Sequence, residues 1–188
     1  FLARNFAKKN TSEYNGKKIV WKKDFPKISF TDALKRYALV TDYHKATREE
    51  LALKAKQFGV DAGSQEPKGK IADEIYKKIC RPHLVAPTFV INHPVEISPL
   101  AKLRAPGSNE VRRFQLIAGG LELVNGFAEL NDPRDQRQRF ESQLALKKEG
   151  DEEAHAIDED FIEALEYGMP PAAGIGIGID RLAMLLTD

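Results

Sequence analysis

An alternation of glycine and isoleucine near the C-terminus is the most unusual pattern in the chain. Gly174, Gly176 and Gly178 alternate with isoleucines, which is the two-residue period of a β-strand. One face of this strand is bare backbone, and we expect the isoleucines to hold the opposite face in the core. A planar ligand such as a nucleobase could lie on the bare face, although a helix packed closely on the glycines would explain the same pattern.

Arg181 follows this strand at the point where an apolar run, residues 182–185, predicts a helix. A guanidinium in this position could stack on a base or pair with a phosphate. Asp180 beside it could cap the helix. The glycine spacing does not match the phosphate-binding G-x-G-x-x-G turn, which lies in a loop between a strand and a helix. The pattern therefore does not predict that turn.

A second segment, residues 122–132, carries polar and aromatic residues at strand spacing. With a strict two-residue period, Asn125, Phe127 and Glu129 share one face, and Glu122 lies on the other. An amide, an aromatic ring and a carboxylate could bind a primary ammonium on an alkyl stem, with Phe127 packing on the methylenes and Glu129 meeting the charge. A solvated strand face explains the segment equally well.

Other familiar catalytic patterns are missing from the sequence. The four histidines have no metal-site spacing, and no Ser-His-Asp or nucleophile-elbow motif occurs. Cys80, the single cysteine, cannot form an internal disulfide, and we expect a buried structural thiol. The proline-rich stretch at residues 94–102 could form a pocket wall or an ordinary surface loop.

Composition indicates one domain that does not enter a membrane. The chain has 188 residues, 42% of them hydrophobic, and a net charge of +1, which gives no argument for nucleic-acid affinity. No apolar run approaches the roughly 20 residues of a spanning helix, and no signal peptide is recognisable. We expect a soluble, cytoplasmic protein.

Periodicity and capping signals predict an α+β domain on a mostly antiparallel sheet. Asn15-Gly16 predicts a hairpin-like turn, Thr47 and Glu50 form a capping-box pattern, and Asp132-Pro133 is typical of a helix start. The predicted strands are residues 19–21, 88–91, 113–118, 122–125 and 174–179, and the predicted helices are residues 31–37, 47–58, 71–79, 133–150 and 159–168. Phe1, Leu2 and Phe6 resemble the middle of a further amphipathic helix.

Three blocks carry a family resemblance: GGLELVNGFAELNDPRDQRQRF, GDEEAHAIDEDFIEALEYGMPP and GIGIGIDRLAML. In this order and spacing they resemble the closing part of the class II lysyl-tRNA synthetases. GKIADEIYKKI and PTFVINHPVEISPLAK upstream are similar to the same family. The resemblance implies the class II synthetase catalytic fold, an antiparallel sheet flanked by helices. It also implies joining of lysine to ATP with Mg²⁺ on the phosphates, and transfer of the lysyl group to tRNA(Lys).

The resemblance assigns the glycine strand to ATP. By this resemblance Arg181 is a catalytic arginine that contacts ATP near its base and γ-phosphate, and Gly174, Gly176 and Gly178 form the sheet floor beneath the nucleotide. Glu122 matches a carboxylate that binds magnesium and ATP. These assignments agree with a bare strand face that accepts a planar ligand.

The resemblance also assigns the second segment to lysine. Asn125, Phe127 and Glu129 match lysine-pocket residues, with Glu129 accepting the ε-ammonium. The family's usual second metal-binding glutamate, seven residues before Glu122, is Gln115 here. An amide oxygen can still bind magnesium but without the charge, so we expect fewer or weaker metal sites.

The first and second class II motifs and an N-terminal OB-fold anticodon domain are not found in this sequence. We therefore expect residues 1–188 to be an incomplete, C-terminal part of the catalytic domain, inactive alone, from a full-length homodimer. A related ligase that lysylates elongation factor P is an alternative, since it shares the NGF-x-EL segment. A non-catalytic binding module is another, which Gln115 slightly favours.

Overall fold

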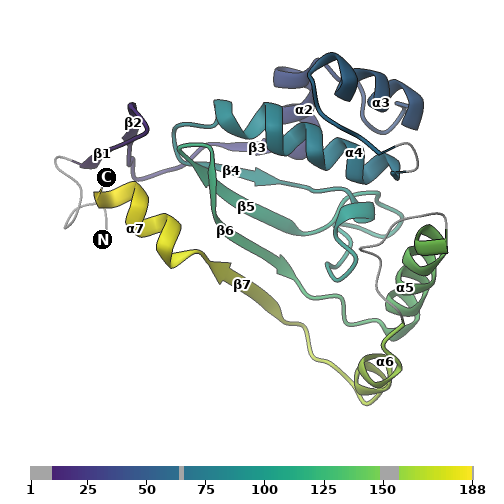
Figure 1. The fold of residues 1–188 in the computed structure, drawn as a ribbon. Coiled ribbons are helices and arrows are strands. Elements are labelled where there is room, and N and C mark those ends of the chain that lie inside the picture. The colour runs from purple at the N-terminus through teal and green to yellow at the C-terminus, as the bar shows by residue number, and fades with distance from the viewer. Residues whose placement is uncertain (1–9, 64–65, 149–156, 188) are drawn as a thin grey trace.

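The computed structural model describes residues 10–63, 66–148 and 157–187, so the expected helix around Phe1 and Phe6 lies outside the described residues. A five-stranded sheet forms the centre of the molecule (Figure 1). Its strands, in spatial order, are β3 (Lys27–Ser29), β4 (Thr88–Ile91), β5 (Arg113–Ala118), β6 (Leu121–Ala128) and β7 (Ala173–Ile177). Only β3 and β4 pair in parallel, which confirms the predicted, mostly antiparallel α+β sheet.

Helices cover one face of the sheet at the β3 end (Figure 1). They are α2 (Phe30–Ala38), α3 (Arg48–Gln57) and α4 (Lys68–Ile75). Phe30 and Ile75 are fully buried in one cluster with Val90 of β4 and Ile117 of β5. The predicted capping box is confirmed, because Thr47 and Glu50 form it at the start of α3, and Ser29 caps α2.

The predicted helix over residues 71–79 changes character at its centre. After α4 the chain forms a π turn, η2 (Tyr76–Cys80), and then a 3₁₀ turn, η3 (Arg81–His83). A 3₁₀ turn is common at the end of a helix, whereas π turns are rare and often occur near functional sites. Cys80 is fully buried here, as expected, and burial raises the pKa of its thiol to about 12.

Two smaller groups of elements pack at the other margins of the sheet. A hairpin of β1 (Thr11–Tyr14) and β2 (Lys17–Val20) turns at Asn15 and Gly16, both with positive φ, and packs with α7 (Ile179–Thr187). At the opposite end, α5 (Pro133–Lys148) contacts α6 (Glu159–Glu166), while the 3₁₀ turn η4 (Val95–Ile97) contacts α4. No helix of the described residues is long and apolar enough to cross a membrane.

A β-bulge between β5 and β6 corrects the predicted placement of Glu122. Leu116 pairs with Val124 and Ile117 pairs with Glu122, so Leu123 is an extra residue on β6. An extra residue reverses the alternation of faces. Glu122 therefore shares its face with Asn125, whereas a strict two-residue period placed them on opposite faces.

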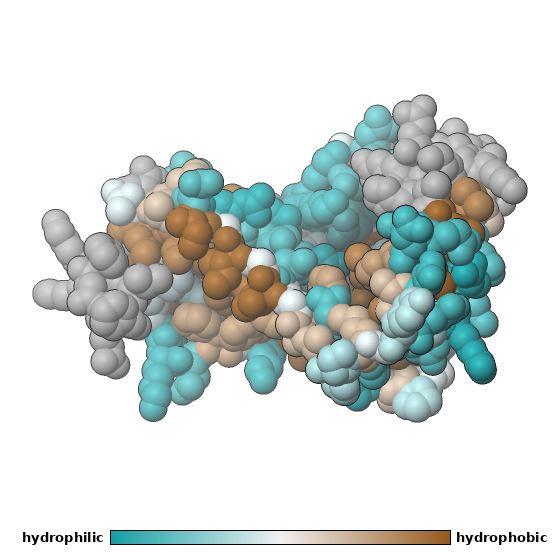
Figure 2. Space-filling view, turned by 90° about the horizontal axis from the view of Figure 1, so that it is seen from below, coloured by the Kyte–Doolittle hydropathy of each residue, from teal (hydrophilic) through white to brown (hydrophobic). Residues whose placement is uncertain are grey.

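The expectation that the isoleucines of β7 are buried is wrong. Ile175 is 63% exposed and Ile177 is 51% exposed. β7 is the last strand of the sheet, and among the described residues no helix covers the face on which these side chains lie. Figure 2 shows the resulting hydrophobic surface over β7 and α7.

Candidate active site

The glycine face of β7 forms the floor of a cavity with β6 and α7. This cavity of about 470 Å³ is lined by Glu122, Leu123, Asn125, Gly176, Ile177, Gly178, Asp180 and Arg181. Five residues predicted from the sequence therefore lie together, although they come from positions about fifty residues apart. The strand register explains this, because Asn125 pairs directly with Gly176 and Phe127 with Gly174.

Gly174 and Gly176 differ in what lies above them. A side chain at Gly174 would collide with the Glu129 carboxylate, so the absence of a Cβ makes room for that group. A Cβ at Gly176 would have no atom nearer than the Asn125 carbonyl oxygen, at 3.8 Å. No helix among the described residues packs on these glycines, and the floor at Gly176 is open.

Glu129 continues the same face beyond Phe127. In the described part of the chain its side chain forms no ion pair and no hydrogen bond. The proline-rich loop lies alongside as a wall, since Ala101 forms a β-bridge with Glu129 and the Leu130 amide donates to the Leu100 carbonyl at 2.9 Å. A carboxylate without a partner beside a fixed wall is suited to an incoming cation.

Arg113 is a site residue that the sequence analysis missed. It is half-buried in β5, and its Nε donates to Asn125 Oδ1 at 3.0 Å. Its Nη1 donates to the Ile97 carbonyl at 2.8 Å and to Ser98 Oγ at 3.0 Å. Arg113 therefore ties Asn125 to the loop wall. The signal that could have revealed Arg113 is its position opposite Phe127 in the sheet, but that position is known only once the strand register is known.

Three polar side chains surround Glu122 at the other end of the cavity. Arg181 reaches back from α7 and donates from Nη1 to the Glu122 carbonyl at 2.8 Å. Arg81 of η3, also missed, places Nη1 4.0 Å from Glu122 Oε2. Gln115 is buried in β5 and donates from Nε2 to Glu122 Oε2 at 2.7 Å.

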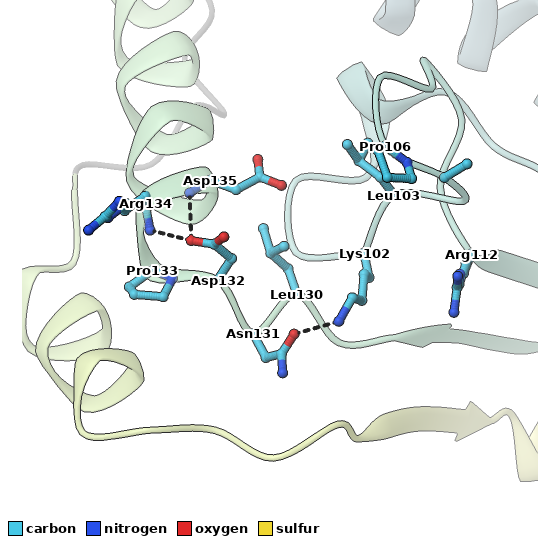
Figure 3. Close-up of a pocket in the computed structure, with 11 residues that line it drawn as sticks. Lys102, Leu103, Pro106, Arg112, Leu130, Asn131, Asp132, Pro133, Arg134 and Asp135 are labelled. Carbon is cyan, nitrogen blue, oxygen red and sulfur yellow. Dashed lines mark hydrogen bonds between the residues drawn. The ribbon is translucent and has the colours of Figure 1, made fainter.

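A larger cavity of about 730 Å³ lies beyond the end of β6, and none of the site residues predicted from the sequence lines it. Figure 3 shows it between the residue 102–112 loop and the start of α5, with Lys102 Nζ donating to Asn131 Oδ1 at 2.8 Å. Asp132 accepts from the Arg134 amide at 2.9 Å and so caps α5. These contacts give Lys102, Asn131 and Asp132 structural roles at this cavity.

Comparison with known proteins decides the family. The model of the class II tRNA synthetases (D, K and N) matches residues 2–188. This chain belongs to that family. Similar curated relatives are the lysine–tRNA ligases of Moorella thermoacetica, 44% identical over 188 residues, and Staphylococcus haemolyticus, 46% identical over 176 residues. The alignments cover 100% and 94% of this chain but only 38% and 36% of the relatives' lengths.

Class II synthetases use Mg²⁺ with ATP, and the described residues fit such an ion only in part. No group of three or more His, Cys, Asp or Glu side chains that could hold a metal occurs among them. Glu122 and Asp180 are the two carboxylate residues that line the cavity. One carboxylate suffices where substrate phosphates and water supply the other ligands, which is the usual arrangement for Mg²⁺.

Proposed function

We propose that this chain is part of a lysine–tRNA ligase, which activates L-lysine with ATP and transfers the lysyl group to the 3′ end of tRNA(Lys). One observation carries the proposal. Glu122, Arg181 and the open glycine floor line one cavity, and Glu129, whose side chain has no ion pair or hydrogen bond among the described residues, continues its face. The names of the similar relatives support the same activity.

Lysine is placed at the Glu129 end. Its ε-ammonium pairs with the Glu129 carboxylate, which has the space left by Gly174, and its methylenes lie against Phe127. Asn125, fixed by Arg113, supplies an amide toward the middle of the face. This arrangement selects a long side chain that ends in a cation.

ATP is placed at the Glu122 end. Its adenine lies flat on the backbone of Gly176 and Gly178, and Arg181 reaches the base and the γ-phosphate. Glu122 would hold Mg²⁺, which would supply charge neutralisation on the phosphates. At ~3.3 Å per residue, β6 spans roughly 20 Å between the two ends, enough for lysine joined to an adenylate.

Activation is then mostly positioning and charge stabilisation. A lysine carboxylate oxygen forms a bond to the α-phosphorus of ATP while the bond to the β-phosphate oxygen breaks, and pyrophosphate leaves. A ribose hydroxyl of the terminal adenosine of tRNA(Lys) next attacks the lysyl carbonyl, and AMP leaves. Arg181 and Glu122 act at the phosphates, whereas Glu129 and Asn125 orient the amino acid.

We further propose that residues 1–188 form the C-terminal part of the catalytic domain of a full-length, homodimeric, cytoplasmic enzyme. The chain spans less than two fifths of its curated relatives, so other segments are available to complete the site. Such segments would supply a group for the α-phosphate. The isolated chain is expected to be inactive.

Lysine-dependent exchange of pyrophosphate into ATP tests the proposal. We expect exchange by the full-length protein and none by residues 1–188 alone. Lack of exchange by the full-length protein would refute the proposed activation, and exchange by the short chain would refute the requirement for other segments. Comparing tRNA(Lys) with elongation factor P as the lysyl acceptor distinguishes the ligase from its nearest alternative.

A further inference from the structure

Gln115 occupies the position where the resemblance suggested a weak magnesium ligand, but its side chain is fully engaged. It lies in β5 with 5% of its surface exposed. Its Nε2 donates to Glu122 Oε2 at 2.7 Å, and its Oε1 accepts from the Tyr76 hydroxyl at 2.9 Å. His93 Nε2 lies 3.3 Å from the same Oε1.

The orientation of the Gln115 amide follows from its partners. An ionised carboxylate only accepts hydrogen bonds, so the atom beside Glu122 Oε2 has to be the NH₂ group. Oε1 then faces Tyr76 and His93. His93 is buried with its Nε2 beside Oε1, and because an amide oxygen only accepts hydrogen bonds, that ring nitrogen carries the hydrogen and donates.

Two donors occupy both lone pairs of the Gln115 carbonyl oxygen. A metal ion would have to displace the Tyr76 hydroxyl or the His93 ring, and both side chains are about 1% exposed. Glu122, by contrast, uses one oxygen for Gln115, while its Oε1 has no hydrogen bond among the described residues. The oxygen available to a cation therefore belongs to Glu122.

We propose that Gln115 is a positioning residue rather than a magnesium ligand. Tyr76 and His93 hold its amide, and the amide holds one oxygen of Glu122 so that the other faces the cavity. The inference rests on the proposed function, in which Glu122 serves the ATP-bound Mg²⁺. Of the two positions that the resemblance assigns to metal, 115 and 122, only Glu122 then supplies a cation ligand in this protein.

The test uses the full-length protein, with Mn²⁺ as the probe and a non-hydrolysable ATP analogue as the nucleotide. Electron paramagnetic resonance of free Mn²⁺ gives the number of bound ions, and pyrophosphate exchange gives kcat. The variants are Gln115→Met, Tyr76→Phe and Gln115→Glu. Gln138→Met is the matched control, because Gln138 is exposed on α5.

For Gln115→Met we expect an unchanged number of bound Mn²⁺ ions and a kcat about tenfold lower, the worth of one charge-assisted hydrogen bond. Tyr76→Phe should lower kcat in the same way, and the double variant should be no worse than Gln115→Met. Gln115→Glu should bind Mn²⁺ more tightly, because two carboxylates this close bind a cation better than one. Gln138→Met should match the unmodified protein.

Loss of a bound Mn²⁺ ion in Gln115→Met at saturating Mn²⁺ would overturn the inference, since loss of a positioning residue weakens a metal site without removing it. Additive effects of Gln115→Met and Tyr76→Phe on kcat would show that Tyr76 does not act through Gln115, which would also contradict the inference. Urea unfolding of each variant separates misfolding from a local effect. If the unmodified protein shows no lysine-dependent exchange, the proposed function is refuted instead. The inference about Gln115 is still tested in that case, by comparing Mn²⁺ binding without nucleotide between Gln115→Glu and the unmodified protein.

Discussion

Substituting Gly174 by alanine is expected to weaken lysine binding without destabilising the fold. An alanine Cβ would occupy the space taken by Glu129 Oε1, so the carboxylate has to move. Ordinary van der Waals contact requires a displacement of about 1 Å. An ammonium–carboxylate hydrogen bond of about 2.8 Å would then lengthen beyond the range of a hydrogen bond.

A hydrogen bond to a charged group contributes about 1.5–3 kcal/mol, which is roughly a 10- to 100-fold change in affinity. We therefore expect the KM for lysine in pyrophosphate exchange to rise by about that factor in Gly174→Ala of the full-length protein. Stability should not fall, because the displaced atom is the end of a flexible side chain and alanine in a strand is about 0.5–1 kcal/mol better than glycine.

Gly176→Ala is the matched control on the same strand and face. Its Cβ would meet nothing closer than 3.8 Å, so Glu129 stays in place and the KM for lysine should not change. The new methyl group lies in the proposed nucleotide cavity, so the KM for ATP should rise instead. An unchanged lysine KM in a folded Gly174→Ala variant, or equal effects of both substitutions on lysine, would refute this reasoning.

Three further predictions concern buried groups. Arg113→Met should lower the free energy of unfolding by about 2–4 kcal/mol, because three half-buried or buried acceptors on Asn125, Ile97 and Ser98 lose their donor, whereas exposed Arg112→Met should change it far less in urea titrations. His93 has its pKa lowered to about 3 by burial, so the unfolded state binds the extra proton below pH 6.5. Stability should then fall by about 2 kcal/mol from pH 7 to pH 5, and His93→Gln should reduce this slope. Cys80, with its pKa raised to about 12, should not react with iodoacetamide at pH 8 until the protein is unfolded.

Local signals in the sequence predicted most of the elements. Thr47 and Glu50 define the start of α3 through contacts within one turn, and Asn15-Gly16 defines a hairpin turn through its own backbone preferences. Strands β4 and β5 also lie where apolar runs between turn residues predicted them. These features depend on neighbours in the chain, which is why the sequence alone reveals them.

The faces of the site depend on pairing, which the sequence does not display. The bulge at Leu123 arises because β6 has one residue more than β5 over the same stretch, and no residue type in β6 signals it. It brings Glu122 onto the face of Asn125 and within reach of Gln115. Arg113 of β5 and Arg81 of η3 were missed for the same reason, since each contacts a residue of β6, which is a different element.

Hydrophobicity was misleading for β7. A buried position is the usual expectation for isoleucine, but burial requires a neighbour as well as an apolar side chain. Ile175 and Ile177 are exposed because β7 is an edge strand whose isoleucine face has no cover among the described residues. The alternation itself correctly separated a bare face from an apolar one.

The placement of the site follows from where the covering helices end. Gln115 faces both Tyr76, at the π turn after α4, and Glu122, so one face of the sheet is core at β4 and β5 and a cavity at β6 and β7. Packing at one end stabilises a sheet whose other end is left open by glycines that each weaken the strand. Filling that open end with side chains should stabilise the fold and impair the proposed chemistry, which is the trade-off expected when a strand face serves as a binding floor.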